Sequence, residues 1–125
     1  MIGAFRAFWP MVFVALLALA GCGGKSDSEL LTSARGYLDK HDTASAIIEL
    51  KNLLQQNPES GEGRFLLGKL LFESGGTADA EAHLTRALEA GQPRDDVLPL
   101  LAAAMVSQGK STQLLQQYGN EDLKN

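Results

Sequence analysis

The sequence predicts an all-α protein in which three helix-turn-helix hairpins, about six helices, stack into an α-α superhelix. Two observations carry this prediction. From about residue 28 onward, apolar residues recur at the i, i+3, i+4 spacing of amphipathic helices. The same pattern of small, apolar and turn residues then returns every 34 residues, which is the signature of a repeat array.

The central hairpin, residues 62–91, shows the pattern most clearly. Gly75 and Gly76 separate two amphipathic halves, and small residues occupy the positions where two helices must approach closely. One helical face carries Leu67, Gly68 and Leu71, and the other carries Ala80, Leu84, Ala87 and Leu88. We expect Gly68 to pack against Ala80, and this hairpin to be the best ordered because it has a neighbour on both sides.

The period of 34 aligns three copies, at about 27–60, 61–94 and 95–118, ahead of a polar tail at 119–125. Gly75 in the turn of the central copy corresponds to Gly109 and, less well, to His41. The aligned helix positions are Ala34, Gly68 and Ala102; Tyr37, Leu71 and Met105; Ala46, Ala80 and Leu114; and Leu50, Leu84 and Tyr118.

These copies resemble the tetratricopeptide (TPR) repeat family, from about Asp27 to Tyr118. The departures are the absence of an opening Trp, the large Leu114, and the missing proline after the third copy. The resemblance implies that the hairpins pack through Ala34, Tyr37, Ala46, Gly68, Ala80, Ala87 and Ala102.

Capping and stop residues predict the helix boundaries in order. The expected helix starts are Ser28, Thr43, Thr77, Asp95 or Asp96, and Ser111. The expected ends are Asn57-Pro58 for the second helix, Gly91 for the fourth and Tyr118-Gly119 for the sixth. Pro99 is expected in the first turn of the fifth helix, where proline is tolerated.

Residues 1–21 are typical of a secretory signal, because Arg6 precedes an apolar run that is too short to span a membrane. The run ends in Leu19-Ala20-Gly21-Cys22, which resembles the bacterial lipobox. That resemblance implies cleavage before Cys22 and attachment of acyl chains, palmitate among them, to this cysteine. The alternative is an ordinary signal whose cleavage site happens to precede a cysteine.

Residues 22–27 are expected to form the lipidated N-terminus and a flexible tether of small and polar residues. Gly23 follows the cysteine, as in lipoproteins that are passed on to the outer membrane of Gram-negative cells. We therefore expect a bacterial envelope protein, anchored in the lipid bilayer through Cys22, at the periplasmic face of the outer membrane.

The composition argues against a nucleic-acid partner, because the net charge is −4 and no run of Lys or Arg offers phosphates a basic stripe. One cysteine excludes an internal disulfide and a Cys-rich metal site. We expect His41 in a turn and His83 on an outer helix face, where they form no metal cluster.

No catalytic residue, cofactor or small-molecule substrate is predicted. The run from Gly63 to Leu70 nearly matches a P-loop, but Leu70 stands where Ser or Thr must meet Mg²⁺, and the run reads as helix. Ser107 and Lys110 have S-x-x-K spacing without its companion motifs. We therefore expect a non-enzymatic protein.

The TPR resemblance implies that a protein or peptide partner binds the concave surface formed by the first helix of each hairpin. The residues expected there are Leu31, Arg35, Leu38, Phe65, Lys69, Phe72, Pro99, Ala103 and Val106. This apolar surface with two cations suits a peptide with bulky apolar anchors. The alternative is that Phe65 and Phe72 pack against neighbouring helices while Arg35 and Lys69 are merely solvated.

The lipobox and repeats together resemble the start of the TPR lipoproteins of exosortase/PEP-CTERM systems, which accompany export of exopolysaccharide and sorting of surface proteins. TPR lipoproteins of pilus assembly are an open alternative. A third is that the chain is the N-terminal part of a longer protein whose activity lies beyond residue 125, because the last copy has no capping helix. Its apolar residues would then be incompletely covered: Leu98, Leu101, Met105, Leu114 and Leu115.

Overall fold

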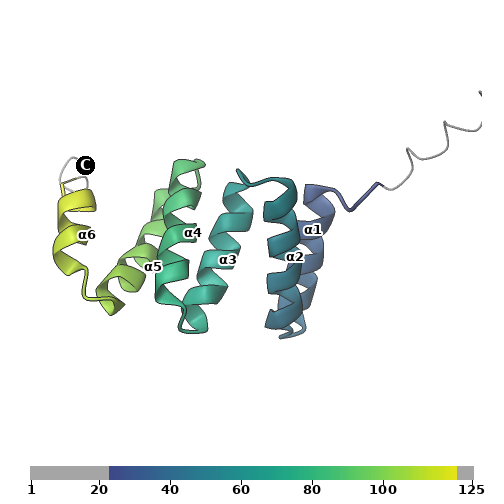
Figure 1. Ribbon diagram of the computed structural model, residues 1–125, viewed down its shortest axis with the longest axis horizontal. Coiled ribbons are helices and arrows are strands. Elements are labelled where there is room, and N and C mark those ends of the chain that lie inside the picture. The colour runs from purple at the N-terminus through teal and green to yellow at the C-terminus, as the bar shows by residue number, and fades with distance from the viewer. Residues whose placement is uncertain (1–22, 121–125) are drawn as a thin grey trace, which may run out of the picture.

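The computed structural model describes residues 23–120, which form six α-helices and no strand within that range. Consecutive helices pair into three hairpins that follow one another along the long axis of the molecule (Figure 1). The helices are α1 (Asp27–Asp39), α2 (Thr43–Gln56), α3 (Gly61–Glu73), α4 (Thr77–Glu89), α5 (Arg94–Ser107) and α6 (Ser111–Tyr118). The predicted all-α hairpin architecture is confirmed. Among these helices none is both long and apolar enough to cross a bilayer.

The turn within each hairpin repeats with the predicted period. His41, Gly75 and Gly109 all have positive φ, of 58°, 89° and 74°. Each donates its backbone N–H to the carbonyl three residues earlier, at 2.9, 3.0 and 2.9 Å. Glycine adopts the left-handed backbone conformation at little cost. His41 is therefore the strained member of the set, although it makes the same turn.

The helix starts at Thr43, Thr77 and Ser111 agree with the prediction, but two others differ. Helix α1 is capped by Ser26 and not by Ser28: the Ser26 hydroxyl accepts from the Glu29 N–H, and the Glu29 carboxylate accepts from the Ser26 N–H at 2.7 Å. This reciprocal capping box satisfies two free donors at once, which a cap at Ser28 would not.

Helix α5 begins at Arg94, one residue earlier than Asp95. Pro99 therefore lies in the second turn of α5 and not in the first. At that depth a proline leaves the carbonyl four residues earlier without its helical donor, and Pro99 is on the exposed side of the helix.

Within the expected tether, the chain already contacts the first hairpin at Lys25. The Lys25 ammonium binds the Glu49 carboxylate on α2 at 2.8 Å and the Ser33 hydroxyl at 3.3 Å. Asp27 follows at once, and its carboxylate accepts from the side-chain amides of Gln56 and Asn57 at 2.7 and 2.6 Å. Of the described tether residues, only Gly23 and Gly24 precede these contacts.

Two buried clusters form the core, and Leu71 of α3 packs against both. Each fully buried leucine stabilises the fold by about 1.5–3 kcal/mol. The first cluster comprises Leu30, Ala34, Ala46, Leu50, Leu53, Leu67 and Leu70. The second comprises Ala80, Leu84, Ala87, Val97, Leu101, Ala104 and Met105.

The small residues lie where the period places them, with differences in detail. Ala34, Ala46, Ala80 and Ala87 are fully buried, whereas Tyr37 and Ala102 are half-buried. A Cβ on Gly68 would lie 2.8 Å from Leu84 Cγ and 3.3 Å from His83 Cβ. An added Cβ on Gly68 would thus meet Leu84 and His83 first, and not Ala80.

The last hairpin is better covered than predicted. Leu101 and Met105 are buried in the second cluster, and Leu98 and Leu114 are half-buried against it. Only Leu115 of the expected set is largely exposed, at 67%. Helix α6 therefore covers α5 with one face and leaves Leu115 on the other.

Candidate partner-binding face

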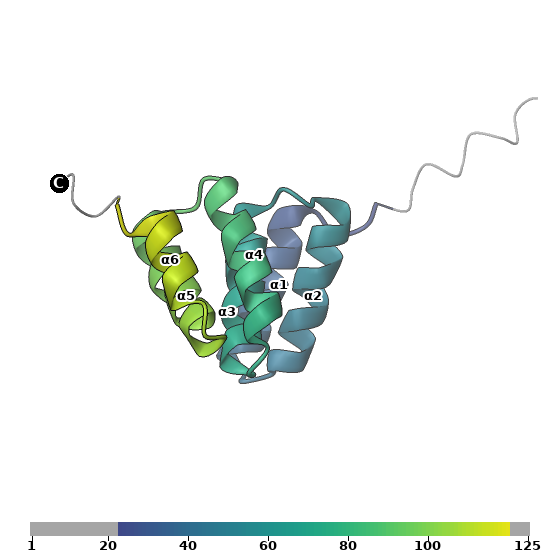
Figure 2. The same ribbon diagram turned by 60° about the vertical axis from the view of Figure 1, so that its left-hand side comes forward.

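The first helices of the hairpins lie in one layer and the second helices in another. In Figure 2, α2, α4 and α6 form the nearer layer, and α1, α3 and α5 lie behind them. We call the side formed by α1, α3 and α5 the first-helix face. Its predicted residues are Leu31, Arg35, Leu38, Phe65, Lys69, Phe72, Pro99, Ala103 and Val106.

The α3 part of the first-helix face combines two aromatic rings with a lysine. Phe65 and Phe72 are half-buried and pack against the second core cluster, so each contributes to the fold and keeps part of its surface exposed. Lys69 is exposed between them, and within residues 23–120 its ammonium group has no recorded ion pair or hydrogen bond. Helical spacing brings the three side chains onto one side of α3.

The α1 part differs in its charge. Leu31 and Leu38 are half-buried against the first core cluster. Arg35 is exposed, and its guanidinium binds the Glu62 carboxylate of α3. That ion pair links neighbouring first helices, so of the two predicted cations it is Lys69 whose ammonium group has no recorded partner among residues 23–120.

The α5 part is apolar and exposed. Pro99, Ala103 and Val106 all reach the surface, and Val106 is 52% exposed. An exposed valine on a face that also carries half-exposed aromatic rings can accept apolar side chains of another chain. The three helices thus offer apolar contacts along the row, with one lysine near the middle.

The two segments that resemble catalytic motifs lie in backbone conformations that do not suit those motifs. The run from Gly63 to Leu70 is entirely inside α3, where its N–H groups belong to the helix and cannot cradle phosphates. Ser107 ends α5, with its hydroxyl bound to the Ala103 carbonyl at 2.8 Å, and Lys110 follows the turn. In residues 23–120 no group of three or more His, Cys, Asp or Glu is placed to hold a metal ion.

Sequence reasoning misplaced His83. It is half-buried, beside Gly68, and its Nδ1 lies 3.1 Å from Nη1 of Arg64. Arginine keeps its protons at any ordinary pH, so Arg64 donates and His83 Nδ1 accepts. Burial lowers the pKa of His83 below its ordinary value, and the Arg64 charge lowers it further. The signal for this pair was Arg64 itself, which occupies the repeat position of Leu30 and Leu98.

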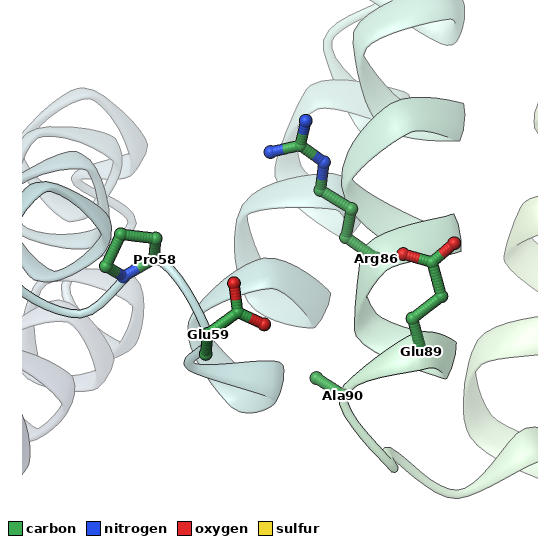
Figure 3. A pocket seen from close by; sticks show the side chains of 5 residues that line it. All are labelled: Pro58, Glu59, Arg86, Glu89 and Ala90. Atoms are coloured by element: carbon green, nitrogen blue, oxygen red, sulfur yellow. The ribbon is translucent and has the colours of Figure 1, made fainter.

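A hollow of about 110 Å³ lies near this pair, between the α2–α3 connection and the C-terminal end of α4 (Figure 3). Its lining residues are Pro58, Glu59, Arg86, Glu89 and Ala90. This hollow is outside the first-helix face, and most of its side chains are charged.

Leu19, Ala20, Gly21 and Cys22 lie outside the described residues, as does the rest of the expected signal. Their proposed processing is therefore argued from sequence alone.

Comparison with known proteins agrees with the geometry. No curated protein matches the chain. Residues 37–104, more than half of the chain, match the family model described as tetratricopeptide repeat. The matched segment runs from the end of α1 into α5 and contains the whole central hairpin. Because the family match and the 34-residue hairpin period coincide, the chain belongs to the tetratricopeptide repeat family.

Proposed function

We propose that this protein is a non-enzymatic, lipid-anchored interaction scaffold of the bacterial cell envelope. TPR repeats generally mediate contacts between proteins. The observation that carries the proposal is the exposed Lys69 set between the partly exposed rings of Phe65 and Phe72. A surface of this kind suits recognition of another polypeptide, and it offers no group for chemistry.

The partner is a peptide segment, extended or helical, with bulky apolar side chains and a carboxylate near them. Its apolar side chains would cover the exposed edges of Phe65, Phe72 and Val106. Its carboxylate would pair with Lys69, since Arg35 is bound to Glu62. The apolar contacts supply most of the affinity, and the charge pair fixes the orientation.

Anchoring through Cys22 is supported by the sequence Leu19-Ala20-Gly21-Cys22. Each buried CH₂ of an acyl chain contributes about 0.8 kcal/mol, so the two or three chains of a lipoprotein would hold it stably in a bilayer. The resemblance to TPR lipoproteins of exosortase/PEP-CTERM systems supports a role in exopolysaccharide or surface-protein export. Gly23 after the cysteine supports the outer membrane as the site.

The partner-binding proposal is tested with Lys69→Glu combined with Val106→Ser. Both side chains are exposed, so the helical circular dichroism should not change. Affinity pull-down from solubilised envelopes should then lose a protein that the wild type retains. Ile48→Ser, at an equally exposed residue of α2, is the control and should retain it. Equal retention by all three proteins would contradict the assignment of this face.

The identity of the retained protein separates the two envelope roles. Components of exopolysaccharide export favour the proposed role, and secretin subunits favour pilus assembly.

The anchor is tested by Cys22→Ser, which removes the only thiol of the chain. We expect the protein to move from the membrane fraction to the soluble periplasmic fraction, because no acyl chain can be attached. Unchanged membrane association would show that the lipobox interpretation is wrong.

A further inference from the structure

The charged side chains of the first-helix face follow the 34-residue period from one hairpin to the next. Arg35 of α1 binds the carboxylate of Glu62, which lies in the first turn of α3. One period later the same positions hold Lys69 of α3 and Asp96, in the first turn of α5. We call Arg35 and Glu62 the first charge pair, and Lys69 and Asp96 the second. Each pair has its cation on one first helix and its anion on the next.

The buried residues show that α3 and α5 stand in the row in the same register. α1, α3 and α5 follow one another along the long axis of the molecule (Figure 1). Because Glu62 reaches back to α1, Asp96 lies on the side of α5 that faces α3. The residues that establish this register are buried in both helices: Gly63, Leu67 and Leu70 in α3, and Val97, Leu101 and Ala104 one period later in α5.

The two charge pairs differ in one respect, because only the first is closed. Lys69 and Asp96 are both exposed, and neither forms an ion pair or hydrogen bond with a residue in the part of the chain that the structure describes. Side-chain chemistry accounts for the difference. Aspartate is one methylene shorter than glutamate, and an ammonium group is a point charge where a guanidinium offers a planar fork. The second pair therefore presents a cation and an anion to a partner.

We propose that Lys69 and Asp96 select the partner segment by the order of its charges, with an acidic side chain over α3 and a basic side chain over α5. This inference rests on the proposed binding of a peptide to the first-helix face. Apolar contacts with Phe65, Phe72 and Val106 hold the segment there. The second charge pair then decides which segments fit and in which direction they lie, since opposite charges attract and like charges placed together are costly.

The partner class is tested with a displayed library of random short peptides, selected on the immobilised full chain in a nonionic detergent. The enriched peptides should combine bulky apolar residues with an acid and a base. Enrichment of apolar peptides without recurring charges would overturn this inference and leave the proposed function standing, because Lys69 and Asp96 would then satisfy each other. Enrichment of no peptide at all would contradict the proposed function itself.

The order of the charges is tested with two synthetic peptides, an enriched one and the same peptide with its acid and base exchanged. The exchange replaces two attractions by two repulsions, so the wild type should bind the exchanged peptide about tenfold more weakly. The variant Lys69→Asp with Asp96→Lys should show the opposite preference. Equal affinity of the wild type for the two peptides would overturn the proposal.

The matched control exchanges the charges of the first pair, in Arg35→Glu with Glu62→Arg. These two side chains can still bind each other, so the control should keep the preference of the wild type. All four substituted side chains reach the surface, so both variants should keep the helical circular dichroism. A control that prefers the exchanged peptide would show that Lys69 and Asp96 do not set the order of the charges.

Discussion

At the scale of single residues, Gly68 decides how closely α3 and α4 approach. Its missing Cβ leaves room for Leu84, which is fully buried. The period of 34 predicted a small residue here, but not which side chain would fill the space. The partner of Gly68 depends on the axial offset of two helices, which the alignment of copies does not specify.

Gly68→Ala should therefore destabilise the protein by about 1–3 kcal/mol through overpacking, although alanine favours helix by about 1 kcal/mol. The matched control is Gly36→Ala in α1, where an added Cβ meets nothing within 4 Å. That change should stabilise by about 0.5–1 kcal/mol. Urea unfolding measures both, and a stabilising Gly68→Ala would refute the close contact.

The Arg64–His83 pair makes stability depend on pH. The folded-state pKa of His83 is lowered from 6.5, so the folded state favours the neutral ring. Its contribution is complete above about pH 6.5 and is lost as pH falls through the lower folded-state pKa. Burial is the main cause of the lowered pKa of His83; the charges of Arg64, Arg86 and Lys51 lower it further, and Asp79 opposes them.

We expect the urea midpoint of the wild type to fall between pH 7.5 and about pH 5. His83→Gln should flatten this dependence, because it removes the titrating ring. Asp42 and Glu29 also have lowered pKa values, from 3.8 and 4.5, so their losses come at more acidic pH. The same slope in both proteins would show that His83 is not the source.

At the scale of elements, the repeat pattern predicted turns and most helix starts but not every cap. His41, Gly75 and Gly109 take the same turn because the flanking helices repeat with one period. The sequence pattern predicted Ser28 as the cap of α1, whereas the structure has Ser26. Both serines are typical cap residues, and only the reciprocal hydrogen bonds between Ser26 and Glu29 distinguish them. Such choices depend on side-chain geometry that spacing does not encode.

Replacing His41 in the turn between α1 and α2 should increase the thermal stability of the protein. His41 has φ 58°, a conformation that costs a non-glycine residue about 1–2 kcal/mol. His41→Gly should raise the thermal unfolding midpoint, and the reverse change, Gly75→Ala at φ 89°, should lower it. If the two changes shift the midpoint in the same direction, the shared turn geometry is not what limits stability.

At the scale of the whole molecule, two core clusters joined through Leu71 hold three hairpins in a row and leave a separate face for contacts. The fold followed from the sequence because a 34-residue hairpin repeat has few ways to bury its apolar stripes. The pairing of the charged side chains could not be predicted from the sequence in the same way. Arg35 and Lys69 looked alike in sequence, yet only Arg35 is paired, because Glu62 reaches it from the next hairpin.

The most direct measurement is in vivo photo-crosslinking from single positions. A photoreactive residue in place of Lys69, on the first-helix face, is compared with one in place of Ile48, which is 59% exposed on α2. The account predicts that position 69 crosslinks a discrete envelope protein and that position 48 does not. Crosslinks of the same partner from position 48 alone, or from neither position, would contradict it.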